Sequence, residues 1–134
     1  MSDYSSRTGT SGSGTVATDE TSELIASNKV EGTRVYNRQG ENLGTVHNFM
    51  VNKRSGQVEY AVMSFGGFLG MGESYHPLPW KSLTYDARQG GYVVDIDKSK
   101  LQAGPSYKAG EEPTYDRAYG QRVYEHYDVP FGGI

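Results

Sequence analysis

The 134-residue sequence contains no cysteine, so the protein can form no disulfide, no thiolate metal site and no cysteine nucleophile. Apolar residues are also scarce. The hydrophobic fraction is 35%, which predicts that part of the chain lies outside a packed core. The sequence lacks a run of about 18 apolar residues, the length that a membrane-spanning helix needs. We therefore expect no membrane insertion.

Charge of one sign is limited as well. Thirteen basic and sixteen acidic side chains give a formal net charge of −3, and neither sign forms a long block. Proteins that bind nucleic acid over a broad surface are usually basic, so nucleic acid is not an expected partner. The first 22 residues are mostly Ser, Thr and Gly and lack the apolar region of a secretory signal. The expected location is therefore cytoplasmic.

Glycine and tyrosine, in contrast, are abundant. Eighteen glycines, and eleven tyrosines against four phenylalanines, favour many turns between strands that carry half-exposed aromatic side chains. We therefore predict an all-β fold. Residues 1–22 hold too few apolar side chains to offset the entropy of ordering, which predicts a disordered, flexible leader. A barrel domain over residues 23–104 and a tyrosine-rich tail over residues 105–134 complete the predicted organisation.

Six short segments have the composition and alternation of β-strands: residues 33–36, 43–53, 57–65, 73–78, 84–86 and 92–96. In the second segment, Val46 and Met50 are expected on one face and Leu43, Phe49 and Val51 on the other. The prolines of the fourth segment cannot donate ladder hydrogen bonds, which places that strand at an edge or a corner. Strands at this spacing predict a closed or nearly closed small barrel.

Two helices are predicted after the last strand. The first covers residues 97–103, with Asp97 as its N-cap. The second covers residues 114–127, where Tyr115, Tyr119, Val123 and Tyr127 recur at intervals of four and so share one side. This side can pack on the protein's own barrel or contact a partner, and the spacing leaves both possibilities open.

Several motifs follow one another between residues 27 and 104: residues 32–36, Leu43-Gly44-Thr45-Val46, the strand at 57–62, the glycine-rich run 64–72 and the run 76–83. Their order resembles that of the PRC-barrel family, which includes the barrel of the photosynthetic reaction centre H subunit. The passage from Phe65 to Trp80 resembles the small stand-alone bacterial members in particular. The resemblance implies a compact β-barrel that acts mostly in protein interaction or assembly, and it implies no catalytic residues.

The glycine-rich segment from Phe65 to Trp80 is the main candidate for a binding surface. Clustered backbone N–H groups can bind anions, but no Lys-Ser/Thr pair follows the glycines and the next element is a strand, so a phosphate site is not predicted. The large apolar side chains of Phe68, Leu69, Met71 and Trp80 are instead expected to cap the barrel or to meet a second subunit. With Tyr115, Tyr119 and Tyr127 of the tail, they are the predicted interaction residues.

No catalytic, cofactor-binding or metal-binding residue is predicted. His47, His76 and His126 are far apart and lack the spacing of metal ligands. Asp95 and Asp97 could face the same side, but helix capping is a sufficient role for Asp97. The serines have no nucleophile-elbow context.

The sequence thus favours a non-enzymatic module that binds proteins and associates with a second copy of itself. The protein partner's identity is not predicted. The alternative is a barrel that binds a small ligand or RNA, with Lys53 and Arg54 as a local basic patch.

Overall fold

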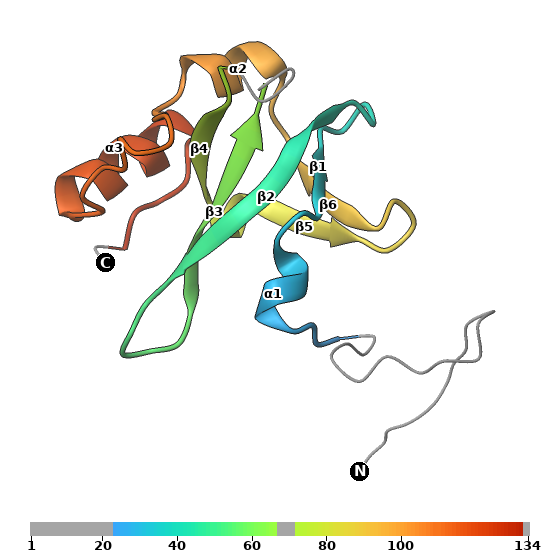
Figure 1. The fold of residues 1–134 in the computed structure, drawn as a ribbon, viewed down its shortest axis with the longest axis horizontal. Coiled ribbons are helices and arrows are strands. Elements are labelled where there is room, and N and C mark those ends of the chain that lie inside the picture. The colour runs from blue at the N-terminus through green and yellow to red at the C-terminus, as the bar shows by residue number, and fades with distance from the viewer. Residues whose placement is uncertain (1–22, 67–71, 133–134) are drawn as a thin grey trace. The chain divides into compact units, whose positions relative to one another are not determined.

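The computed structural model describes residues 23–66 and 72–132, and the chain divides into two compact units at Val30. The first unit contains the short helix α1 (Ser27–Val30). The second unit starts at Glu31 and contains a six-stranded sheet with the helices α2 (Lys98–Ala103) and α3 (Arg117–His126) (Figure 1). The predicted leader, residues 1–22, lies outside the described residues.

The six predicted strands are all present. They are β1 (Arg34–Tyr36), β2 (Asn42–Val51), β3 (Val58–Phe65), β4 (Ser74–Pro79), β5 (Leu83–Asp86) and β6 (Gly91–Val94). Their order in the sheet is β4-β3-β2-β1-β6-β5, and all neighbours are antiparallel except β1 and β6. The sheet curves, so that β5 and β6 run across the direction of β2 and β3 (Figure 1). The all-β prediction is confirmed, although the sheet is a half-barrel and not a closed ring.

A β-bulge at His47 changes the faces that alternation predicts along β2. The pairing with β3 shifts between Val46 and Asn48, so His47 is an additional residue on β2. Val46 lies before the bulge and Phe49 after it. Their partners on β3 are two residues apart, so Val46 and Phe49 share a face. The prediction that Val46 and Met50 share a face is wrong, because the bulge breaks the period of two.

Strand β4 lies at the edge of the sheet, as its prolines predict. Tyr75 forms an antiparallel bridge with Tyr107 of the tail, with N–H to carbonyl oxygen distances of 2.8 and 3.0 Å. Pro77 and Pro79 follow Tyr75 at intervals of two, so their backbone nitrogens point to the same outer side of β4 as the Tyr75 N–H. Neither proline has an N–H to offer to another strand there. The edge is therefore protected by the tail at one end and by prolines at the other.

Helix α2 begins where the capping pattern predicts. The Asp97 carboxylate accepts a hydrogen bond of 2.8 Å from the Lys100 N–H, and this bond lowers the pKa of Asp97. Leu101 on this helix is fully buried. It joins a core of apolar side chains from five strands: Val35, Leu43, Val46, Ala61, Val62, Met63, Leu78 and Val94.

Helix α3 confirms the predicted helix in the tail but begins three residues later, at Arg117. Asp116 is its N-cap, and its carboxylate accepts a hydrogen bond of 2.9 Å from the Tyr119 N–H. The helix lies beside β4 (Figure 1), with Val123 fully buried and Tyr124 nearly so. The tail therefore packs on the barrel of its own chain in this structure.

Replacing Asp116 with alanine should weaken this packing by about 1 kcal/mol, because the Tyr119 N–H loses its acceptor. Urea unfolding followed by circular dichroism measures the loss. Asp116→Asn keeps a capping oxygen and should stay close to the wild type. Equal midpoints for Asp116→Ala and the wild type would show that the cap does not hold the helix.

Candidate functional site

A continuous row of aromatic rings crosses the sheet on one side. Phe49 of β2 lies with its ring centre 6.4 Å from that of Trp80, in the 3-10 helix η2 (Trp80–Ser82) that joins β4 to β5. Trp80 contacts Tyr92 of β6 at 5.5 Å, and Tyr92 contacts Tyr85 of β5 at 5.4 Å. We call Phe49, Trp80, Tyr92 and Tyr85 the aromatic row.

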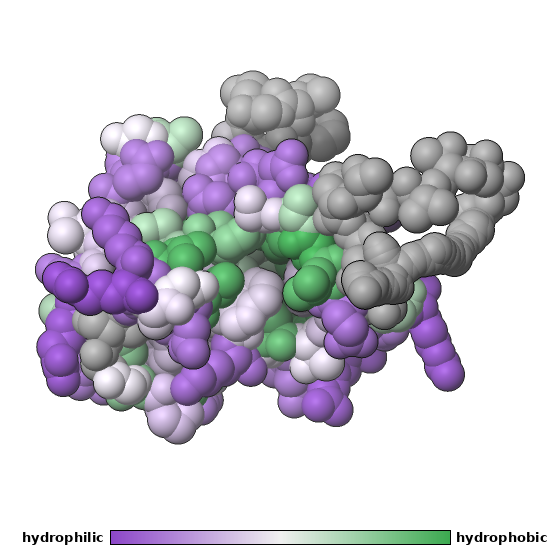
Figure 2. All heavy atoms as spheres, turned by 90° about the horizontal axis from the view of Figure 1, so that it is seen from below, coloured by the Kyte–Doolittle hydropathy of each residue, from purple (hydrophilic) through white to green (hydrophobic). Residues whose placement is uncertain are grey.

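Part of the aromatic row is accessible to solvent. Tyr85 is 52% exposed, Phe49 and Trp80 are half-buried, and Val51 near the end of β2 is 44% exposed. Seen from below Figure 1, residues of high hydropathy gather near the centre of the view with hydrophilic residues around them (Figure 2); the scale ranks Tyr and Trp as slightly hydrophilic, so the rings of Tyr85, Tyr92 and Trp80 are not among the green atoms. Exposed apolar surface with a polar border is typical of a protein contact site.

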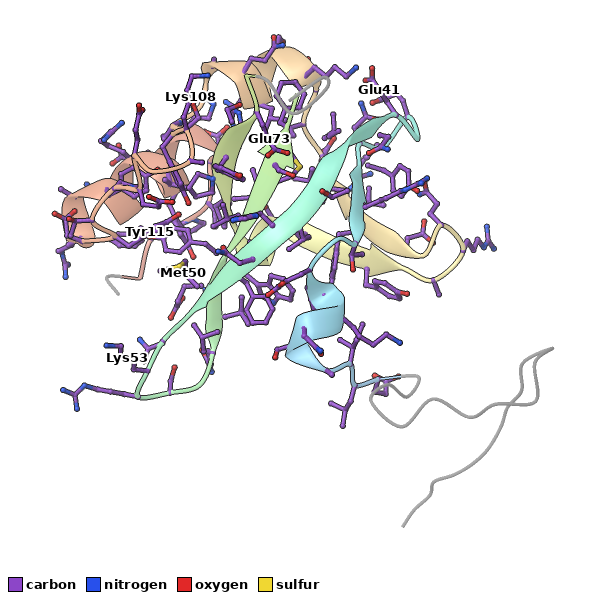
Figure 3. All side chains as sticks on the ribbon, in the orientation of Figure 1. Glu41, Met50, Lys53, Glu73, Lys108 and Tyr115 are labelled. Carbon is purple, nitrogen blue, oxygen red and sulfur yellow. The ribbon has the colours of Figure 1, made fainter. Side chains whose placement is uncertain are left out.

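The basic residues considered for a nucleic-acid patch lie elsewhere, in the turn between β2 and β3. Lys53 lies at the tip of this hairpin (Figure 3), and Arg54 beside it is exposed as well. The Asn52 side chain accepts hydrogen bonds from the N–H groups of Arg54 and Ser55, both at 2.9 Å, and fixes the turn. Two cations on one turn form a small patch, far less than the basic surface that nucleic-acid binding usually requires.

A second group of aromatic rings joins the tail to the barrel. Tyr60 of β3 contacts Tyr115 at 5.2 Å and Tyr124 at 5.6 Å between ring centres, and Tyr119 contacts Tyr115 at 5.2 Å. The Tyr124 hydroxyl donates a hydrogen bond of 2.7 Å to the carbonyl oxygen of Glu59. We call Tyr60, Tyr115, Tyr119 and Tyr124 the tyrosine cluster; Tyr115 is labelled in Figure 3.

Burial shifts the titration of these phenols strongly. It raises the pKa of Tyr60, Tyr119 and Tyr124 to about 12 in each case, and it also raises the pKa values of Tyr115 and Tyr127. At neutral pH the rings are therefore uncharged. Their role in the described structure is packing and not proton transfer.

Gly120 allows helix α3 to approach the barrel closely. A Cβ atom at this position would lie 2.5 Å from the Tyr60 hydroxyl oxygen and 2.8 Å from the Phe131 ring. The sequence shows this glycine only as a residue that costs about 1 kcal/mol in a helix. The close contact with Tyr60 explains why the helix contains it.

His76 is the one buried histidine among the described residues, with 2% of its surface exposed. Its Nε2 atom lies 2.9 Å from the Ser74 hydroxyl, and its ring packs edge-on against Phe65. Burial lowers the pKa of His76, and the nearby Leu101 backbone offsets part of that shift. The Nδ1 atom has no hydrogen-bond partner within the described part of the chain. The Ser74 hydroxyl also donates a hydrogen bond of 3.4 Å to the Phe65 carbonyl oxygen, so the pair links β4 to β3 and is not arranged as a nucleophile with its base.

The other histidines have separate structural roles. His126 donates its Nε2–H to the Lys100 carbonyl oxygen at 2.7 Å, and the His47 ring packs against Tyr75. Within the described ranges, no group of three His, Asp or Glu side chains is placed to hold a metal ion. Asp95 and Asp97 do not act as a pair, since Asp95 contacts Arg38 and Asp97 caps α2.

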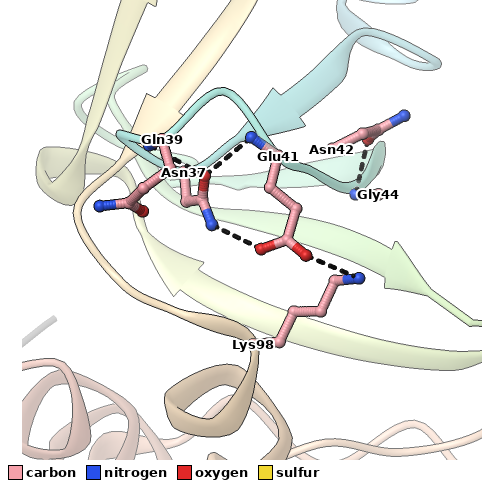
Figure 4. A network of polar contacts seen from close by, with 6 residues as sticks. All are labelled: Asn37, Gln39, Glu41, Asn42, Gly44 and Lys98. Atoms are coloured by element: carbon pink, nitrogen blue, oxygen red, sulfur yellow. Dashed lines mark hydrogen bonds and ion pairs between the residues drawn. The ribbon is translucent and has the colours of Figure 1, made fainter.

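A polar network fixes the turn between β1 and β2 against the start of α2 (Figure 4). Asn37 is 2% exposed and accepts hydrogen bonds from the N–H groups of Gln39 and Glu41, at 3.1 and 2.8 Å. Its amide donates to Glu41 Oε1 at 2.8 Å, while Glu41 Oε2 pairs with Lys98 Nζ at 3.0 Å. Every polar atom of this carboxylate has a partner, so the network is structural.

The structure places the predicted interaction residues in two different environments. Trp80 lies in the aromatic row, whereas Tyr115, Tyr119 and Tyr127 pack against their own barrel. Phe68, Leu69 and Met71 lie outside the described residues. The sequence did not predict that Phe49, Tyr85 and Tyr92 form one row with Trp80. The predicted β5–β6 hairpin was the one signal that could have paired Tyr85 with Tyr92.

These features define a small curved β-sheet module with an accessible aromatic surface. A model of the PRC-barrel domain family matches residues 22–101, which is more than half of the chain. The chain therefore belongs to the PRC-barrel family, and the resemblance noted from its motifs is confirmed. A comparison with curated proteins finds no significant match. None of the described helices is both long and apolar enough to span a membrane.

Proposed function

We propose that the protein is a non-enzymatic, cytoplasmic PRC-barrel module that works through protein–protein contact and associates with a second copy through the aromatic row. The observation that carries the proposal is the accessibility of this row, in which Tyr85 is 52% exposed, together with Val51, two positions after Phe49 on β2, which is 44% exposed. Trp and Tyr are enriched at interface hot spots because they bury a large area at low entropic cost. Membership of the PRC-barrel family supports the proposal that the protein acts as a binding module.

The arrangement of the row suits a symmetric contact. Its four rings come from β2, η2, β6 and β5, so they are held by the rigid sheet and lose little freedom on binding. In a two-fold dimer the same patch is used by both copies. Burial of Tyr85 and Val51 against their counterparts would remove from water the two most exposed large apolar side chains among the described residues of the second unit.

Tyr85→Ser with Val51→Ser should abolish self-association without unfolding the protein, because both side chains are already about half exposed. Light scattering at high micromolar concentration measures the mass. We expect a dimer for the wild type and a large fall in mass, toward that of the monomer, for the double variant. A strictly monomeric wild type would refute the proposal. Phe68→Ser with Leu69→Ser tests separately the contribution predicted for the glycine-rich segment.

Lys53→Ser with Arg54→Ser is the control for this experiment and a test of the alternative function. Both residues are exposed in the turn of the β2–β3 hairpin, so their loss should leave the dimer intact. Salt-dependent retention on immobilised RNA that disappears in this variant would favour the RNA-binding alternative.

A further inference from the structure

The tail is attached to the barrel at two separate places. The first is the two-residue bridge between Tyr107 and Tyr75 on the β4 edge. The second is helix α3, where Val123 is fully buried and Tyr124 reaches the Glu59 carbonyl oxygen. Both attachments are short motifs that any chain with the same sequence can form.

The connection between them, residues 108–116, contacts the barrel through Tyr115, whose ring centre lies 5.2 Å from that of Tyr60. Its residues are exposed except Pro113 and Tyr115, which are half-buried. Its backbone forms one local turn, with a hydrogen bond of 2.9 Å from the Glu111 N–H to the Lys108 carbonyl oxygen and a φ of 83° at Gly110. A change of direction at this glycine keeps the backbone bridge and helix α3 and costs only the contacts of Tyr115, which include a hydroxyl contact of 3.0 Å with Tyr107.

The contact itself is not fully complementary. Tyr119 and Tyr127 are both more than nine-tenths buried, and neither hydroxyl has a hydrogen-bond partner among the described residues. A buried hydroxyl without a partner costs free energy, which partly offsets the gain from packing the rings. The tail is therefore held by apolar packing and a few hydrogen bonds, all of which the same surface on another copy supplies equally well.

We propose that the barrel surface beneath the tail is an exchangeable docking site, which binds either the protein's own tail or the tail of a second copy. The intramolecular tail has the advantage of an effective concentration on the order of 1 mM for a short connection. Exchange should therefore involve about 1% of the chains at about 10 μM and about half of them near 1 mM. Exchanged pairs are closed and two-fold symmetric, so they do not continue into fibres.

A fluorescent peptide of residues 105–132 tests the site in the full-length chain. Val123→Asp places a carboxylate at a fully buried position and should release the chain's own tail. We expect fluorescence anisotropy to show at least about tenfold tighter peptide binding to this variant than to the wild type, because the competing tail is gone. The same peptide carrying Val123→Asp is the matched control and should bind neither protein.

A nicked chain removes the dependence on that substitution. Cleavage at a protease site inserted after Gly110 cuts an exposed connection and leaves both attachments unchanged. The labelled peptide should then replace the cleaved tail, which mass spectrometry of the barrel fraction detects. If a folded nicked chain takes up no peptide, the exchange proposal is wrong. The Tyr85→Ser variant should exchange normally, so failure here is distinguishable from failure of the aromatic-row dimer.

Discussion

Gly44→Ala should prevent the barrel from folding stably. Gly44 lies on strand β2 inside the sheet and has a φ of 155°. Backbone atoms of Ser64 occupy the space that a Cβ at this position would need. The added atom would overlap the Ser64 carbonyl oxygen and lie 3.2 Å from its carbonyl carbon. Because these atoms belong to strand β3, a side-chain rotation cannot relieve the overlap. Strain of this kind costs about 3 kcal/mol or more, a large part of a typical domain's stability.

Urea unfolding followed by circular dichroism and by Trp80 fluorescence measures this loss. Gly56→Ala is the matched control, because Gly56 also has a positive φ, of 77°, but nothing lies within 4 Å of its Cβ position. It should cost about 1–2 kcal/mol from backbone strain alone. Similar stabilities for the two variants would show that the sheet adjusts around Gly44 and that the overlap is not decisive.

The strands and turns could be predicted from the sequence because local chemistry determines them. The β2–β3 turn needs a residue with positive φ, and Gly56 supplies it. The start of α2 follows from the Asp97 side chain, which bonds an N–H only three residues away. In β4, the two prolines showed that the strand lies at an edge, since they cannot donate to a neighbour.

The surface formed by distant segments could not be predicted in the same way. Phe49 and Trp80 are 31 positions apart, and their contact depends on the curvature of the sheet and on the bulge at His47. A bulge inserts one residue without a clear signature in composition, so alternation placed Met50 incorrectly. Gly44 appeared in the sequence as part of a family motif, and only the approach of Ser64 shows why a glycine is required there.

The tail shows the same division between local and tertiary information. Spacing at intervals of four predicted a helix with Tyr119 and Val123 on its packed side, and both are buried. The spacing did not include Tyr124, which contacts Tyr60 and hydrogen-bonds to Glu59. The sequence could not show whether the helix packs on its own barrel or on a partner, because the helix presents the same apolar side in both cases.

Raising the pH from about 10 to 12 should destabilise the tail, because the buried tyrosines must ionise. An isolated phenol has a pKa of 10.0, whereas burial raises the pKa of Tyr60, Tyr119 and Tyr124 to about 12. The folded protein therefore keeps protons that the unfolded chain releases. The stabilisation is complete below pH 10 and is lost progressively as the pH rises toward about 12, by roughly 1–3 kcal/mol for each tyrosine.

Urea unfolding at several pH values between about 9 and 11.5, together with tyrosinate absorbance, measures this dependence. Tyr119→Phe is the sharpest variant, because the Tyr119 hydroxyl is buried and no described residue forms a hydrogen bond with it. The substitution should leave stability at neutral pH unchanged or slightly higher and should reduce the alkaline loss, since one ionising group is removed. If stability is constant across this range, or if Tyr119→Phe falls as steeply as the wild type, the tyrosine cluster does not control docking of the tail.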